Sequence, residues 1–432
     1  MAGTLRFGPA NDAEHTAVRV RTARRCPVLA TTVPPPSRRR DPSLPIPTPR
    51  RESARPDGTG TPFIRRRLTP SMVLGPVRRH PIAAGGLLLG AAVGVSSASG
   101  SRLDPAEWHP PDPPAMTGAL APNRALAGRD RVVALDGPED VAFDDEGRLY
   151  TGCEDGRVYR TVDPVAAGTV DAAVEVFART EGRPLGLTFD GEQLLVAVAG
   201  VGLVSVAPDG DVTTLTARAG GQAIVFADDL HVADDGTVYF TDATVHDQFQ
   251  NELFELRDTG RLLAYDPEAD RTTVELEGLG FANGVVPGPE GESLLVNETS
   301  RYRITRYWTD GERAGEAEPF ATNLAGYPDN IDVADDGGYW VAIPSLRDPT
   351  LDRLHHHPWL VRQLGRLPQS VLGKVSGDPY GLVLRMDADG EVVESLHDPT
   401  GNVFGITSAT PHEGALYLGT LFGEHVVRYP LE

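Results

Sequence analysis

The hydrophobic pattern of the chain is dominated by one short unit that is repeated six times. Its clearest copy, Ala227 to Asp242, contains an apolar strand, the turn sequence Asp-Asp-Gly, and a second apolar strand that ends in an aromatic and a polar residue. Two short strands joined by such a turn are typical of a β-hairpin. The six copies span residues 139–150, 184–195, 227–242, 283–295, 329–340 and 405–417.

The spacing of the copies indicates the fold. Their second strands are anchored at Tyr150, Leu195, Tyr239, Leu295, Trp340 and Tyr417, which are 45, 44, 56, 45 and 77 residues apart. A period in the mid-forties is typical of a four-stranded propeller blade, and the two longer gaps indicate insertions. We therefore predict an all-β fold, a six-bladed β-propeller, over residues 130–432.

The last repeat contains one strand fewer than a blade needs. It offers strands only near residues 403–406, 415–419 and 425–429, whereas Arg131–Leu135 has a strand pattern but no blade of its own. A closed ring leaves no long open edge. We therefore expect Arg131–Leu135 to be the outer strand of the last blade.

The first 80 residues differ sharply in composition from the repeats. They contain sixteen arginines, five acids and thirteen prolines, with no sustained apolar period. Such a segment buries too little apolar surface to offset its ordering entropy, so we expect a disordered basic tail. A chain that started at Met72 would have a short basic head followed by an apolar core, which is the usual order of an export signal. Alternatively, therefore, residues 1–71 are not translated and the start of the chain is mis-assigned.

Residues 81–101 form an uncharged run that follows Arg78 and Arg79. At about 1.5 Å per helical residue the run just spans a bilayer core of about 30 Å. We expect one hydrophobic helix here, as a transmembrane anchor, a cleaved signal segment or, third, a buried helix. Arginines before it and acids after it place the propeller outside the cytoplasm, membrane-anchored or secreted. The Pro- and Ala-rich residues 102–129 are expected to form a linker.

The rest of the chain is strongly acidic. Residues 81–432 contain 24 basic and 56 acidic side chains. Such a surface repels phosphate backbones, so we expect no nucleic-acid partner. The acid excess, with Lys374 as the only lysine, also favours a halophilic origin, because charge repulsion keeps proteins soluble in concentrated salt. The two cysteines, Cys26 and Cys153, provide no disulfide framework.

Four of the six copies have an oxygen-donating side chain at the start of their first strand. These residues are Glu139, Asp228, Asn283 and Asp329. First strands line the central channel of a propeller, so the four side chains can converge on its axis. Oxygen ligands without His or Cys favour calcium, with magnesium as the alternative; the competing interpretation is that each residue caps a turn. Three carboxylates around one axis would repel one another without a cation, which favours the metal.

Other candidates lie next to these residues and on the surrounding loops. Asp140, Asp229 and Asn330 are candidates for supporting the ligands. The long insertion at residues 344–377 is apolar at helical spacing and basic on its other side, as expected for a lid or a membrane-contacting hairpin. We expect its His355, His356 and His357 to form a solvated patch. His246 is a candidate general base, with a surface histidine as the simpler interpretation.

Several motifs resemble the strictosidine synthase-like family, which is related to the gluconolactonases and paraoxonases, over roughly residues 130–432. They are Phe281-Ala-Asn-Gly-Val285, Arg303-Ile-Thr-Arg-Tyr-Trp308, Gly326-Tyr-Pro-Asp-Asn-Ile331, Gly337-Gly-Tyr-Trp-Val-Ala342 and Leu418-Gly-Thr-Leu-Phe422. The amino-terminal hydrophobic segment is similar to that of the membrane-bound branch. The resemblance implies a central calcium held by Glu139, Asp228, Asn283 and Asp329, with Asp228 replacing an asparagine of the lactonase and paraoxonase relatives.

Two residues that relatives use for catalysis have no counterpart in this chain. The plant synthase uses a glutamate in its last blade where this chain has Gly405, and the paraoxonase histidine has no counterpart around Arg183 to Gly186. We therefore expect calcium-dependent hydrolysis of a small lactone or aryl ester, rather than the Pictet-Spengler condensation, with Asp329 or His246 activating water. The alternative is a non-catalytic, membrane-tethered ligand-binding propeller with a structural calcium.

Overall fold

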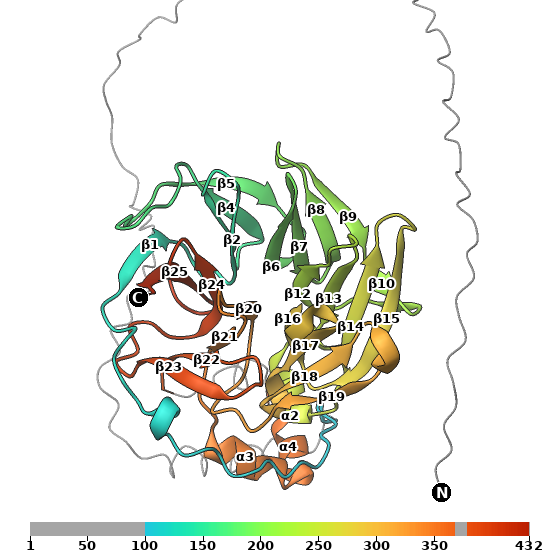
Figure 1. The fold of residues 1–432 in the computed structure, drawn as a ribbon. Helices are drawn as coiled ribbons and strands as arrows, with labels where there is room; N and C mark the ends of the chain where they lie inside the picture. The colour runs from blue at the N-terminus through green and yellow to red at the C-terminus, as the bar shows by residue number, and fades with distance from the viewer. Residues whose placement is uncertain (1–99, 368–377, 432) are drawn as a thin grey trace, which may run out of the picture. The chain divides into compact units, whose positions relative to one another are not determined.

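The computed structural model describes residues 100–367 and 378–431, and its strands form six four-stranded antiparallel sheets arranged as propeller blades (Figure 1). In blades one to five the strands are hydrogen-bonded in chain order, whereas the last blade combines both ends of the described chain. The predicted all-β six-bladed propeller is therefore confirmed.

The first three blades lie between residues 141 and 279. Blade one consists of β2 (Val141–Phe143), β3 (Leu149–Gly152), β4 (Arg157–Thr161) and β5 (Val174–Arg179). Blade two consists of β6 (Arg183–Asp190), β7 (Gln193–Ala199), β8 (Gly202–Val206) and β9 (Val212–Thr216). Blade three consists of β12 (Ala227–Val232), β13 (Val238–Asp242), β14 (Gly260–Asp266) and β15 (Arg271–Leu279). A small separate hairpin is formed by β10 (Arg218–Ala219) and β11 (Gln222–Ala223).

The other three blades complete the ring. Blade four consists of β16 (Ala282–Pro287), β17 (Ser293–Glu298), β18 (Arg303–Trp308) and β19 (Ala317–Ala321). Blade five consists of β20 (Ile331–Val333), β21 (Tyr339–Ile343), β22 (Gly381–Met386) and β23 (Val392–Asp398). Blade six consists of β24 (Ile406–His412), β25 (Ala415–Thr420), β26 (His425–Pro430) and β1 (Asp130–Ala134).

Strand β1 closes the ring as the outer strand of blade six. It pairs antiparallel with β26, with Asp130 opposite Arg428 and Ala134 opposite His425. Val132 and Val133 are fully buried in a cluster that also contains residues of blade one. The predicted role of Arg131–Leu135 is confirmed, with the strand displaced by one residue.

The turns that follow the first strands of blades one, three and five, with the sequence Asp-Asp-Gly or Asp-Asp-Glu-Gly, have the same geometry. After β12 the amide of Gly236 donates to the carbonyl of Ala233 (2.9 Å), and the amide of Ala233 donates to the carbonyl of Thr237 (2.9 Å). Gly236 has a φ of 85°, a left-handed conformation that glycine adopts at little cost. The same pair of hydrogen bonds surrounds Gly147 and Gly337. The turn sequence therefore fixes where these first strands reverse.

In the described part of the chain, three short α-helices lie close together (Figure 1), and apolar side chains from them form one buried cluster. The α-helices are α2 (Gln250–Glu255), α3 (Pro349–His355) and α4 (Pro358–Leu364), and the four 3-10 helices are η1 (Gly118–Leu120), η2 (Pro289–Gly291), η3 (Thr299–Arg301) and η4 (Gly311–Arg313). Asp348 caps α3 by accepting hydrogen bonds from the amides of Thr350 (2.6 Å) and Leu351 (3.2 Å). Helices α3 and α4 belong to the predicted insertion at 344–377, of which residues 368–377 lie outside the described residues.

Residues 100–126 lie against the propeller and its helices. Leu103 is buried with Phe254 of α2 and Val361 of α4. The ring of Trp108 lies 5.6 Å from that of Tyr302. Further along, Leu126 is fully buried within a cluster from blades five and six. Much of the expected linker at 102–129 is therefore packed onto the folded domain.

The predicted basic tail at 1–80 and most of the hydrophobic segment at 81–101 lie outside the described residues. In the part of the chain that the structure describes, no helix has the length and apolar character needed to cross a membrane.

We expect Val133→Ala to destabilise the protein, because Val133 is fully buried in the strand that closes the ring. Removing two methyl groups from such a site costs roughly 1–3 kcal/mol of unfolding free energy. The matched control is Val176→Ala on outer strand β5, where 41% of the residue is exposed and where we expect a change below about 0.5 kcal/mol. Urea unfolding measures both variants; equal effects would contradict a stabilising role for β1.

Candidate functional site

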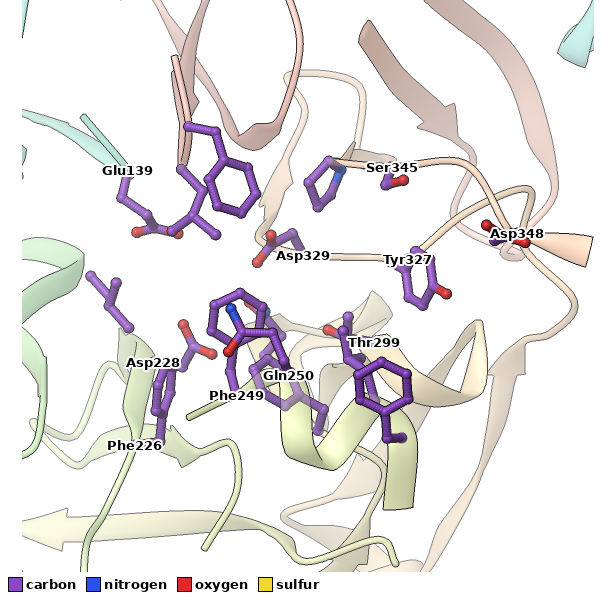
Figure 2. Close-up of a pocket in the computed structure, with 18 of the residues that line it drawn as sticks. Glu139, Phe226, Asp228, Phe249, Gln250, Thr299, Tyr327, Asp329, Ser345 and Asp348 are labelled. Carbon is purple, nitrogen blue, oxygen red and sulfur yellow. The ribbon is translucent and has the colours of Figure 1, made fainter. Parts of the chain in front are cut away.

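Four polar side chains from four blades line one cavity of about 200 Å³ (Figure 2). They are the residues that the sequence predicts as metal ligands, Glu139, Asp228, Asn283 and Asp329. Asp228 and Asn283 are the second residues of β12 and β16, and Glu139 and Asp329 lie two residues before β2 and β20. The structure therefore brings the four residues to one place, and their role as metal ligands stays a prediction.

Hydrogen bonds between blades hold the backbone at these positions. The carbonyl of Glu139 accepts a hydrogen bond from Thr407 Oγ1 of blade six (2.7 Å). The carbonyl of Asp329 accepts one from the amide of Gly284 of blade four (3.2 Å). A Cβ atom at Gly284 would lie 2.8 Å from the carbonyl oxygen of Asp329, so the two inner strands can approach this closely only with glycine. The site is therefore built on the packed sheets.

The four side chains are almost completely buried. Glu139 exposes 2% of its surface, Asp228 and Asn283 expose 3%, and Asp329 exposes 7%. Burial, followed by the charge of Asp329, holds the pKa of Glu139 and that of Asp228 well above their usual ranges. Burial also raises the pKa of Asp329 to about 7. The three acids therefore resist being ionised together when only protein surrounds them.

The donor atoms fit a hard cation. Glu139 Oε2, Asp228 Oδ2 and Asn283 Oδ1 are buried and have no hydrogen-bond partner in the described part of the chain. Burying a polar atom without a partner costs free energy, and one bound cation would satisfy all three oxygens. Because the donors are all oxygen atoms, they suit calcium or magnesium rather than zinc.

The side chains do not form a compact ligand cluster as they stand. Among residues 100–367 and 378–431, no group of three or more acidic, histidine or cysteine side chains is placed so that it could hold a metal ion. Mutual repulsion between carboxylates favours such a separation. Coordination by all four residues would therefore require their side chains to rotate, whereas their backbone positions already surround one cavity.

The next acidic residues accept hydrogen bonds from neighbouring blades, and their predicted support for the ligands stays a prediction. Asp140 Oδ2 accepts a hydrogen bond from the amide of Leu187 (2.9 Å), and Asp229 Oδ2 accepts one from the amide of Val285 (2.8 Å). Together with Asn330, both acids line a second cavity. Each carboxylate thus ties its own blade to the first strand of the following blade.

His246 is not among the residues that line the cavity of the predicted ligands. Its Nε2 atom lies 3.1 Å from Glu255 Oε2 at the end of α2. Donating a hydrogen bond to the carboxylate of Glu255 raises the pKa of His246. The other carboxylate oxygen of Glu255 accepts a hydrogen bond from the amide of Asp104 (2.9 Å). These contacts connect α2 to the amino-terminal segment, and the role of His246 as a base stays a prediction.

The expectation of a solvated patch at His355 to His357 is wrong for its first residue. His355 exposes only 2% of its surface, and its Nε2 atom lies 3.0 Å from the carbonyl of Leu253. Burial lowers the pKa of His355 to about 4, so the ring is neutral at pH 7. His356 is half-buried and His357 is exposed.

The cationic residue of the cavity is not among the residues that the sequence predicts for the site. Arg183, the first residue of β6, lines the cavity together with the predicted ligands. Its Nη2 atom donates a hydrogen bond to the carbonyl of Leu421 (3.3 Å). Pro184 is the residue of blade two that aligns with the predicted ligands. The arginine directly before it was a signal that could have identified this residue.

Aromatic side chains form much of the cavity wall. The ring centroids of Phe226, Phe249 and Phe281 lie 5.8 to 6.5 Å apart. Phe226 and Phe281 each directly precede an inner strand, and Phe249 directly precedes α2. Figure 2 shows Tyr327 and Ser345 farther along the cavity. A ligand would therefore meet apolar rings beside the oxygen donors.

Two family models match parts of this chain. Residues 228–312 match the family model for strictosidine synthase, and residues 118–161 match the model for the amino-terminal part of strictosidine synthase-like proteins. The chain is 35% identical over 324 residues to the Arabidopsis thaliana protein strictosidine synthase-like 13, which covers 68% of this chain and 78% of that protein.

Two further similarities concern the whole propeller. The chain is 36% identical over 353 residues to the adipocyte plasma membrane-associated protein of Danio rerio, with 77% of this chain and 85% of that protein covered. A gluconolactonase structure from Xanthomonas campestris has a similar fold, with a TM-score of 0.50, 19% identity, and coverage of 78% of this chain and 99% of that chain. The identities and coverage confirm the resemblance in the sequence motifs: this chain belongs to the strictosidine synthase-like family.

Proposed function

We propose that the protein is a calcium-dependent hydrolase of lactones or aryl esters. The observation that carries the proposal is the cavity in which four oxygen-donating residues meet an aromatic wall. Three of these residues have a buried oxygen without a hydrogen-bond partner among the described residues. Glu139, Asp228, Asn283 and Asp329 would hold the ion, for which magnesium is the alternative. The fold shared with a gluconolactonase agrees with this class of reaction.

A bound calcium ion would supply a Lewis acid that polarises the substrate carbonyl. In the proposed reaction the oxygen of water bonds to the carbonyl carbon, the ester carbon–oxygen bond breaks, and the departing alcohol oxygen takes a proton. Asp329 is the residue that we assign to accept the proton from water, because it lines the cavity. The aromatic rings of Phe226, Phe249 and Phe281 would hold the apolar part of the substrate.

Strictosidine synthase activity is not proposed. Gly405 stands where the plant synthase has its glutamate, and it has no side chain that could exchange a proton. Its φ of 60° is left-handed, so a larger residue there would be strained. A non-catalytic propeller with a structural calcium is the competing function, and the hydrolysis experiment below separates the two.

We also propose that residues 81–101 attach the propeller to a membrane, outside the cytoplasm, or direct its secretion if they are cleaved. The support is the uncharged run in the sequence and the membrane association stated in the name of the adipocyte relatives. The insertion at 344–377 is a second proposed contact, because Trp359 on α4 exposes 63% of its surface.

Calcium should stabilise the wild-type protein but not Asp329→Ala. An ion present at a hundred times its Kd adds about 2.7 kcal/mol to the unfolding free energy, and the variant loses one charged ligand. In chelator the variant should be at least as stable as wild type, because one buried carboxylate has been removed. Thermal unfolding with calcium or chelator measures the effect.

The matched control for this experiment is Asp335→Ala. Asp335 is an exposed acid in the distal turn of the same blade, whereas its neighbour Asp336 is paired with Arg385. The control should keep the full stabilisation by calcium. The same calcium-dependent shift in wild type, Asp329→Ala and Asp335→Ala would exclude Asp329 from the metal site.

Purified wild type should hydrolyse members of a lactone and aryl-ester panel in calcium and should lose this activity in chelator. Asp329→Asn should lower kcat by roughly a hundredfold or more, the range for loss of a general base. His246→Asn should change kcat less than about threefold, because His246 lies outside the cavity lining. No turnover by calcium-loaded wild type would favour the binding propeller, and a large loss only in His246→Asn would reverse the assignment of the base.

A further inference from the structure

The cavity contains a cation that the proposed metal chemistry does not use. The guanidinium of Arg183 lines the cavity together with Glu139, Asp228 and Asp329. Arg183 belongs to none of the ion pairs within 4.0 Å in the described part of the chain, and its Nε atom is buried there without a hydrogen-bond partner. A guanidinium has five N–H donors, so Arg183 retains donors for a ligand.

Two loops of the backbone hold Arg183 in place. Its Nη2 atom donates to the carbonyl of Leu421 (3.3 Å) in the loop after β25. A Cβ atom at Gly137 would lie 3.0 Å from the same nitrogen, so the guanidinium packs closely against the backbone there. Gly137 has a φ of 60°, which glycine adopts at little cost. The side chain is therefore positioned by uncharged backbone atoms rather than by a carboxylate.

The charges in the cavity balance only when the ion and Arg183 are counted together. The three carboxylates carry three negative charges when ionised, and a divalent cation offsets two of them. Arg183 offsets the third, so the loaded site is neutral and does not repel an anion. A ligand carboxylate that reached the cavity would then find hydrogen-bond donors on Arg183 and apolar rings at Phe226, Phe249 and Phe281.

We propose that Arg183 determines ligand specificity, and that the cavity binds small aromatic carboxylates. This inference rests on the proposed function for its metal ion. It also deepens that function, because hydrolysis of a lactone or ester whose acyl part carries an aromatic ring releases an aromatic carboxylate. Arg183 is placed to bind that product, and to bind the oxygen on which negative charge develops during the reaction. The class of ligand is therefore an aromatic or apolar acid, with the ring on the phenylalanine side.

The test compares phenylacetate with phenylacetamide, which have nearly the same shape and differ in charge. Titrations of the calcium-loaded protein, followed by ligand-observed NMR, should show that wild type binds the acid roughly tenfold more tightly than the amide. Arg183→Met should lose the preference or prefer the amide, because its loaded site carries one net negative charge, whereas Arg183→Lys should retain part of the preference. Arg271→Met, which changes an exposed arginine of outer strand β15, should behave as wild type.

Calcium titration of the same variants shows whether the metal site is intact. Arg183→Met should bind calcium as tightly as wild type or more tightly, because a positive charge has been removed from the cavity. Equal binding of acid and amide by wild type, or an unchanged preference in Arg183→Met, would overturn the assignment. If wild type hydrolyses no ester but shows an Arg183-dependent preference for the acid, the proposed hydrolase fails and the assignment of Arg183 stands.

Discussion

Repulsion between three buried carboxylates is the constraint on which the rest of this site depends. Glu139, Asp228 and Asp329 come from three blades and are each at least nine-tenths buried. A buried charge without compensation costs several kcal/mol, whereas a typical hydrogen bond contributes about 1 kcal/mol. Neutral hydrogen bonds therefore cannot offset the three charges. The protein must protonate these acids or surround them with cations, and Arg183 provides only one positive charge.

The propeller fold makes it possible to maintain such an arrangement. The first strands of blades one to five begin next to the cavity, so residues far apart in the chain meet there without a dedicated loop. Asp140 accepts a hydrogen bond from blade two and Asp229 accepts one from blade four, and these bonds fasten neighbouring first strands. Strand β1 fastens the first and last parts of the ring. A packed frame of this kind fixes the backbone positions of the acids around the cavity, so only their side chains can move apart to relieve the repulsion.

Much of the fold could be predicted because its determinants are local. Each hairpin is encoded within about a dozen residues, by strand periodicity and a turn glycine such as Gly236. The last repeat has one strand too few, which assigns β1 to the last blade. The four predicted ligands occupy equivalent positions in their hairpins; they are Glu139, Asp228, Asn283 and Asp329. Local pattern and position within a repeat were sufficient for these steps.

The features that were missed depend on contacts between distant parts of the chain. His355 is buried because it meets Leu253, and Leu103 is buried because it meets Phe254 and Val361. A Pro-rich segment and a run of histidines therefore resembled solvated chain. Arg183 was overlooked because it directly precedes Pro184, the residue of blade two that aligns with the predicted ligands. Its side chain nevertheless lines the same cavity.

The most direct test of the central claim is a crystal structure of the protein grown with calcium, with anomalous scattering used to locate the ion. We predict one calcium ion on the propeller axis, coordinated by side-chain oxygens of Glu139, Asp228, Asn283 and Asp329. An ion bound only in the second cavity beside Asp140 and Asp229, or no ion at a calcium concentration that stabilises the protein, would contradict it.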